Sequence, residues 1–232
     1  MNWLSRWFAR RAPANRAHAE MLAAYHAAPA PDGQDDIGAQ RFIVVDVETS
    51  GLNPLEDRLL AIGAVGVRGG LISLEDSFEV ILRQKVCSAH DNILVHGIDG
   101  TTQLSGREHP EALLRFLTFA GKAPLVAFHA DFDRIVISRA MHAALDATLS
   151  NAWIDLAAAA PVLFPEHARH AHSLDDWTRL FGIENLSRHN ALADAFATAQ
   201  LLQVVLQRAV ETGERRLVDL MAASSERRWL AP

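Results

Sequence analysis

Hydrophobic residues gather in short runs along the middle of the chain, and their spacing predicts β-strands. Residues 42–45 form a mainly β-branched run that ends at Asp46, which is typical of a buried central strand. Two longer extended runs, 59–67 and 71–82, are joined by Arg-Gly-Gly at 68–70, a sequence that favours a hairpin turn. These three runs therefore predict an antiparallel meander.

The second half of the chain alternates between strand-like runs and helical periodicity. Residues 125–128 follow a proline and predict a fourth strand, and residues 152–156 predict a short fifth strand. Helices are predicted at 109–120, 132–145, 155–163, 173–181 and 190–211. A meander followed by strands that alternate with helices predicts an α/β fold: a mixed five-stranded sheet with helices on both faces.

The two ends of the chain differ from this middle part, so we expect three segments. Residues 1–40 combine an N-terminal helix with a Pro/Ala-rich linker at 27–40, residues 41–210 form the catalytic domain, and residues 211–232 form a helical C-terminal tail. The basic N-terminal helix either contacts a membrane or partner or packs against the domain. Its apolar residues are Trp3, Leu4, Trp7 and Phe8.

The composition limits the chemistry that this chain can perform. Cys87 is the single cysteine, which excludes an internal disulfide and favours a reducing, cytoplasmic location. Any metal must then be held by carboxylate, imidazole or water, which favours Mg²⁺ or Mn²⁺. The net charge of −6 argues against a protein that wraps duplex DNA but suits an enzyme that grips a few nucleotides. No apolar run approaches the roughly 20 residues of a membrane span, so we expect no integral membrane segment.

Asp46 and Glu48 are the first candidate metal ligands. They lie two residues apart at the end of the predicted central strand, so both carboxylates project from the same face. Two acids at the end of an apolar strand repel each other and need a cation. Thr49 and Gly51 follow, where small residues let a ligand approach the backbone, and Leu52 is a candidate wedge for a terminal base. Taken alone, this pattern is equally typical of two surface acids and a turn.

A second group of polar residues lies where the fourth strand meets a helix. His129, Phe132 and Asp133 fall in this junction, the region in which α/β sheets place ligands. Asp131 is predicted to cap the helix, and Asp133 lies in its first turn. Both acids would have a structural explanation if they served only the helix terminus.

A third group, His189 and Asp194, lies at the start of the long Ala-rich helix. If both were helical, their side chains would be about 140° apart around the helix axis. They converge only if His189 belongs to the preceding loop, with Asn190 as the helix cap. A histidine and an aspartate at this spacing are common by chance, so this pair alone indicates no function.

As a set, these motifs resemble the DEDDh 3′–5′ exonuclease superfamily, and in particular its epsilon branch, which includes the proofreading subunit of bacterial replicative DNA polymerase. The first motif, D-x-E-T-x-G-L, is similar to residues 46–52; the second, F-D, to Phe132–Asp133; the third, H-x4-D, to His189 and Asp194. His96-Gly97-Ile98 also resembles the H-G-I segment of the epsilon branch. One departure stands out: His129 replaces an asparagine usual in this branch, which bears on substrate preference.

The resemblance implies a ribonuclease H-like fold and a site with two divalent cations, Mg²⁺ or Mn²⁺. It implies that four carboxylates hold the metals and that His189 accepts the proton of the attacking water. The implied metal ligands are Asp46, Glu48, Asp133 and Asp194. The implied substrate-binding residues are Thr49, Gly51, Leu52, His96, His129 and Phe132.

The implied substrate is a single-stranded nucleic acid 3′ end, DNA in preference to RNA, and the implied partner is a DNA polymerase subunit. The same residues would serve an exoribonuclease that trims RNA ends or short oligoribonucleotides. A different class, an inactive module that binds nucleic acid or a polymerase, would be expected to have lost a metal ligand. All five catalytic positions are intact in this chain, which favours an enzyme.

Overall fold

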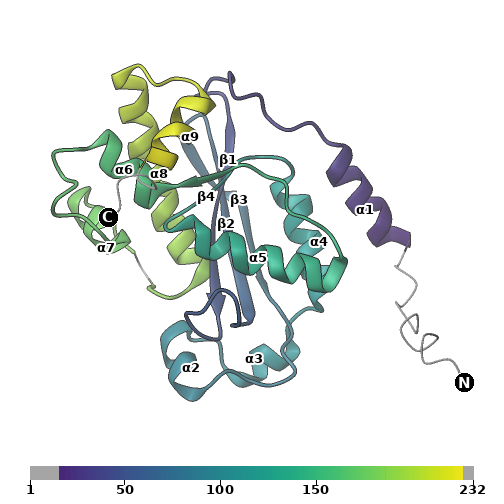
Figure 1. The fold of residues 1–232 in the computed structure, drawn as a ribbon. Helices are drawn as coiled ribbons and strands as arrows, with labels where there is room; N and C mark the ends of the chain where they lie inside the picture. The colour runs from purple at the N-terminus through teal and green to yellow at the C-terminus, as the bar shows by residue number, and fades with distance from the viewer. Residues whose placement is uncertain (1–15, 186, 227–232) are drawn as a thin grey trace, which may run out of the picture.

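The computed structural model describes residues 16–185 and 187–226, and its centre is one five-stranded sheet (Figure 1). The strand order is β3-β2-β1-β4-β5. The strands are β1 (Arg41–Thr49), β2 (Leu59–Arg68), β3 (Leu71–Ile81), β4 (Leu125–Ala127) and β5 (Trp153–Asp155). β1 pairs antiparallel with β2, and β2 with β3, whereas β1, β4 and β5 run parallel. The predicted mixed sheet is confirmed.

The turn between β2 and β3 depends on two glycines. Gly69 and Gly70 have φ angles of 59° and 71°, which side chains other than glycine rarely adopt. Two consecutive residues in this region match the twist of the flanking strands, so the Arg-Gly-Gly sequence closes a tight hairpin as predicted.

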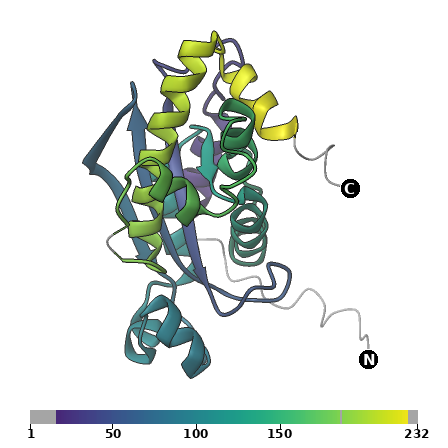
Figure 2. The ribbon, with the colours of Figure 1, turned by 90° about the vertical axis from the view of Figure 1, so that its left-hand side faces the viewer.

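Helices cover both faces of the sheet (Figure 2). One face packs against α8 (Ala191–Thr212), with α6 (Leu156–Leu163) and α7 (Leu174–Leu180) beside it. The other face packs against α4 (His109–Ala120) and α5 (Ala130–Leu145). Each apolar layer removes a sheet face from water, which is the main force that holds such a domain together.

The strand β1 divides its side chains between these two layers. Phe42 and Val44 lie in the layer under α8, while Ile43, Val45 and Val47 lie in the layer under α4 and α5. Because side chains alternate along a strand, the series that begins with Phe42 and Val44 continues on the α8 side of the sheet. The acids of β1 belong to that series.

Two short helices, α2 (His90–His96) and α3 (Gly100–Ser105), lie beyond one end of the sheet (Figure 1). At the opposite end, α9 (Leu217–Glu226) packs on α6 and β5. Ile37 is buried, and its backbone N–H donates to Arg215 O at 2.9 Å, so the segment before β1 contacts the chain before α9.

Helix α1 (Arg16–Ala27) packs against α4 and buries Tyr25, whose hydroxyl donates to Asn151 Oδ1 at 2.5 Å. The four apolar residues at positions 3, 4, 7 and 8 that we expected to support an N-terminal helix lie outside the described residues. Within the described ranges, no helix is both long and apolar enough to cross a membrane.

Candidate active site

The paired acids of β1 lie at the carboxyl end of the strand. Asp46 pairs in register with Gly63 of β2. A Cβ atom on Gly63 would come within 2.2 Å of the backbone of Ala191, the first residue of α8. Glycine at this position therefore lets the beginning of α8 approach the strand directly opposite Asp46.

This close approach brings Asp194 to the acids of β1. Asn190 caps α8 by accepting a hydrogen bond from Ala193 N at 3.0 Å, and Asp194 lies in the first turn. Carboxylate oxygens of Asp46, Glu48 and Asp194 lie within 4.8 Å of one another. The condition placed on the third motif is met, because His189 precedes the cap with a φ of 61° and is outside the helix.

Asp133 approaches the same end of β1 from the opposite layer. It lies in the first turn of α5 and is only 5% exposed. The backbone N–H of Val47 donates to its carboxylate, so Asp133 is anchored between the two acids of β1. It raises the pKa of Asp46, although it is not part of the compact group of three carboxylates.

The junction that carries Asp133 differs in one detail from the expectation. Helix α5 begins at Ala130, and its N-cap is His129 in a left-handed conformation with a φ of 64°. Asp131 was expected to cap the helix, but it lies inside the first turn and pairs with Arg134 at 2.9 Å. The Asp155 carboxylate accepts a hydrogen bond from His129 N at 2.9 Å, which helps to hold this unusual backbone conformation.

Burial and mutual repulsion raise the pKa values of the carboxylates in this cluster. Burial, followed by the charges of Asp133, Asp194 and Glu48, raises the pKa of Asp46 well above its ordinary value. Burial raises the pKa of Glu48 to about 8, with a further contribution from Asp194, and burial also raises the pKa of Asp133 to about 8. Such carboxylates gain most from a bound cation, since its charge offsets both the lost hydration and the mutual repulsion that favour the protonated form.

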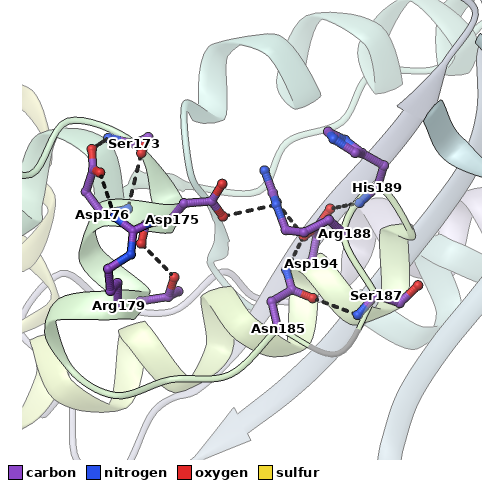
Figure 3. A network of polar contacts seen from close by, with 10 residues as sticks. Ser173, Asp175, Asp176, Arg179, Asn185, Ser187, Arg188, His189 and Asp194 are labelled. Carbon is purple, nitrogen blue, oxygen red and sulfur yellow. Dashed lines mark hydrogen bonds and ion pairs between the residues drawn. The ribbon is translucent and has the colours of Figure 1, made fainter.

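A positively charged side chain already contacts one acid of this cluster, Asp194 (Figure 3). The Arg188 guanidinium contacts Asp194 with an Nη1–Oδ1 distance of 2.7 Å, and its charge lowers the pKa of Glu48. Asp194 also accepts hydrogen bonds from the Asn185 side chain and from His189 N. In Figure 3 the imidazole of His189 takes no part in the contact between Arg188 and Asp194. The donor set is thus all oxygen and attracts cations, which fits Mg²⁺ or Mn²⁺.

A cleft of about 730 Å³ opens over the carboxylates. Leu52 is 91% exposed at this cleft. All six predicted substrate-binding residues line it: Thr49, Gly51, Leu52, His96, His129 and Phe132. Asp46, Glu48, His189 and Asp194 also line it, whereas Asp133 lies behind the surface. The structure therefore brings every predicted site residue to one place.

The cleft also contains residues that the sequence motifs did not indicate: Asn92, Val95, Ser173, Leu174 and Arg188. Arg188 directly precedes His189, so its charge beside a motif residue was a usable signal. Asn92 donates to the carbonyl oxygen of Ser50, in the loop that carries Leu52. Nothing in its sequence surroundings signals that contact.

The fold and the acidic cluster together define a ribonuclease H-like nuclease. The family model described as RNase_T, Exonuclease, matches residues 43–202. The chain belongs to this exonuclease family, and the predicted class of enzyme, a 3′–5′ exonuclease, is confirmed. Members of this family use divalent metal ions.

Curated relatives include two DNA polymerases III of the PolC type. The protein from Oceanobacillus iheyensis is 31% identical over 170 residues, which is 73% of this chain and 12% of the relative. The protein from Caldanaerobacter subterraneus is 28% identical over 186 residues, which is 80% of this chain and 13% of the relative. The chain therefore corresponds to a small part of these polymerases.

Solved structures support the fold. Exonuclease I of E. coli, in complex with a dT13 oligonucleotide, matches with a TM-score of 0.62 at 18% identity, covering 75% of this chain and 43% of that chain. Exonuclease X, in complex with 5′ overhanging duplex DNA, matches with a TM-score of 0.62 at 20% identity, covering 79% of this chain and 99% of that chain.

Proposed function

We propose that this chain is a two-metal-ion exonuclease that removes nucleotides from DNA 3′ ends and releases nucleoside 5′-monophosphates. The observation that carries the proposal is the convergence of four acids from β1, α5 and α8 at a cleft large enough for terminal nucleotides. Clustered carboxylates of raised pKa at an open cleft are characteristic of catalytic sites.

Four residues would hold the metals: Asp46 as the shared ligand, Glu48 and Asp194 beside it, and Asp133 from behind. Bound metal ions in such sites activate a water and stabilise the charge that develops on the leaving oxygen. The three grouped carboxylates fit this task because their oxygens already lie within 4.8 Å. The location of Asp133 behind the cleft surface suits a supporting ligand, direct or through water.

His189 would accept the proton of the attacking water. It is exposed, it lines the cleft, and its backbone N–H donates to Asp194 at 2.8 Å, so its loop is tied to the carboxylate cluster. Imidazole titrates near neutrality and suits a general base. The side chain needs no direct contact with a metal ion for this role.

The terminal bases would be held by apolar groups at the cleft. Leu52 is exposed enough to act as a wedge, and Phe132 offers a ring against which a base can stack. The small residues Thr49 and Gly51 leave the strand end open to the phosphate backbone. His129 would contact the terminal nucleotide, while His96, whose ring nitrogens are hydrogen-bonded to Ser88 and Ile98, would form part of the cleft wall beside it.

DNA is the proposed substrate, and a DNA polymerase subunit the proposed partner, in a reducing cytoplasm. Support comes from relatives that are DNA polymerases and from similar folds solved with a dT13 oligonucleotide and with overhanging duplex DNA. An exoribonuclease remains the alternative, since the net charge of −6 suits short oligonucleotides of either kind. Substrate choice lies in the cleft residues, above all His129.

The test uses 5′-labelled DNA and RNA oligonucleotides of equal sequence, single-stranded and duplex, with Mg²⁺, with Mn²⁺ and with a chelator. We expect a ladder that shortens from the 3′ end, faster on single-stranded DNA than on RNA, and no cleavage with chelator. A faster ladder on RNA would establish the exoribonuclease instead. Absence of cleavage on every substrate would overturn the proposal.

A further inference from the structure

Arg188 lies between two acids that belong to different helices (Figure 3). Its Nη1 contacts Asp194 of α8 at 2.7 Å, and its Nε contacts Asp175 of α7 at 3.0 Å. Two different nitrogens make these contacts, so one guanidinium joins α7 to the beginning of α8. The loop that carries His189 runs between these helices.

Asp194 and Asp175 differ in burial and in their other contacts. The side chain of Asp194 is 6% exposed and also accepts hydrogen bonds from Asn185 and His189, whereas that of Asp175 is 48% exposed. Only Asp194 belongs to the compact carboxylate group. Asp175 is therefore free of the cluster, while Arg188 is not.

A divalent ion on Asp194 and the guanidinium of Arg188 would compete for the same carboxylate oxygens. Two positive charges a few ångströms apart also repel each other strongly where water is partly excluded. The contact with Asp175 meets no such conflict. Because it is half exposed, it costs little to adjust as the side chain moves.

We propose that Arg188 is a positioning residue that releases Asp194 when metal enters the carboxylate cluster and remains bound to Asp175. In this arrangement Asp175 holds Arg188, and with it the adjacent His189, in place over the site. The inference rests on the proposed metal site and adds a residue, Asp175, that lies outside it.

Helix α7 is a firm anchor for this exchange. Ser173 and Asp176 form a reciprocal capping box at its N-terminus, and Trp177 is buried at 1% exposure in the layer under α8. Asp175 lies between these fixed points. Its carboxylate is therefore held close to where Arg188 now contacts it.

The experiment is a double-mutant cycle on the full chain, with Mn²⁺ alone as the probe and calorimetric titration as the measurement. Asp175→Asn leaves Arg188 with Asp194 as its remaining acidic partner, so we expect Mn²⁺ affinity to fall by about threefold to tenfold. In an Arg188→Gln background, Asp175→Asn should change the affinity by less than about twofold, because no guanidinium competes.

Asp219→Asn is the matched control. Asp219 also lies in the first turn of a helix, α9, and pairs with an arginine, Arg216, at 2.7 Å, away from the carboxylate cluster. It should leave Mn²⁺ affinity unchanged. Thermal unfolding checks that each variant is folded, and Asp175→Ser replaces the asparagine variant if that one does not fold.

A second readout separates positioning from a merely structural role. Asp175→Asn should lower kcat by about tenfold, because the general base His189 is displaced. KM for the oligonucleotide should change less than about twofold, because the cleft is intact. Equal losses of Mn²⁺ affinity in both Arg188 backgrounds, or no loss in either, would overturn the exchange. If the unmodified chain bound no Mn²⁺ at all, the proposed function itself would fail.

Discussion

The two halves of the candidate site are built in opposite ways. Asp46 and Glu48 belong to β1, whose backbone is hydrogen-bonded on one side to β2 and, further back, on the other to β4. Arg188 and His189 belong to a loop whose described contacts at the site are side-chain ion pairs and the hydrogen bonds to Asp194. The sheet fixes the position of Asp46 and Glu48, the strand half, whereas ion pairs and hydrogen bonds to charged groups fix the position of Arg188 and His189, the loop half.

This difference has consequences for how each half responds to change. A side chain removed from β1 leaves the strand where it is, because the sheet and its two apolar layers hold it. A charge removed from the loop alters the position of its neighbours, since ion pairs are the main contacts that locate it. Metal binding should therefore depend mainly on the first half, with a smaller effect of Arg188 through its contact with Asp194, and the rate of turnover on both.

The largest effect is expected on the strand half. Asp46→Asn should lower turnover by at least about 10⁴, because it removes the proposed shared metal ligand while the fold remains intact. Cleavage of a labelled oligonucleotide in saturating Mn²⁺ measures the loss, and thermal unfolding confirms folding. Retention of more than a few per cent of activity would remove Asp46 from its proposed role.

The loop half should show a smaller loss. His189→Ala should lower turnover by about 10²–10⁴, the usual contribution of a general base, with little change in metal affinity. The limb of the pH–rate profile that reports the general base should disappear in the variant. If excess metal restored the rate, His189 would be a metal ligand; if the rate never fell, it would have no role in catalysis.

The strand half should also control stability in the absence of metal. The pKa of Glu48 is raised to about 8, so the folded chain binds its proton more tightly than the unfolded chain does. When folding raises the pKa of an acid, the free energy of unfolding is unaffected below the unfolded pKa near 4.5. It then falls as the pH rises from there through the folded pKa of about 8. We expect Glu48→Gln to raise the melting temperature by about 3–8 °C at pH 8.5 and by little at pH 4.

Asp219→Asn again serves as the comparison for this measurement. It also removes one carboxylate, but the pKa of Asp219 is lowered by Arg216, whereas that of Glu48 is raised. Its effect should be destabilising or neutral at pH 8.5. Addition of Mg²⁺ should stabilise the unmodified chain more than the Glu48→Gln variant. A melting temperature for Glu48→Gln that tracked the unmodified chain at every pH would contradict the raised pKa argued for Glu48.

The smallest effect is expected at the cleft mouth. Leu52→Ala should raise KM for single-stranded DNA by about threefold to tenfold with kcat nearly unchanged, since an apolar contact with one base is lost. Leu55→Ala is the matched control: Leu55 is 68% exposed in the same loop but does not line the cleft. Equal effects of the two variants would show a general loop effect and not a base contact.

Much of the fold could be predicted because period and turn chemistry are local properties. The run 42–45 and the glycines at 69 and 70 predicted β1 and the β2–β3 hairpin within a few residues. The junction at His129 was harder. Its left-handed conformation is held by Asp155, a residue 26 positions away, so local capping preferences pointed to Asp131 instead.

The order of the motifs and the alternation of β1 were enough to place Asp46 and Glu48 on one face and to predict a carboxylate site. They could not show that the missing side chain of Gly63 lets α8 approach the sheet. Nor could they show that Asp133 reaches the cluster from the opposite layer, or that Arg188 links Asp194 to Asp175. Side-chain direction follows from the backbone period, which is local. The distance between residues far apart in the chain depends on how closely two elements pack, which only the assembled tertiary structure decides.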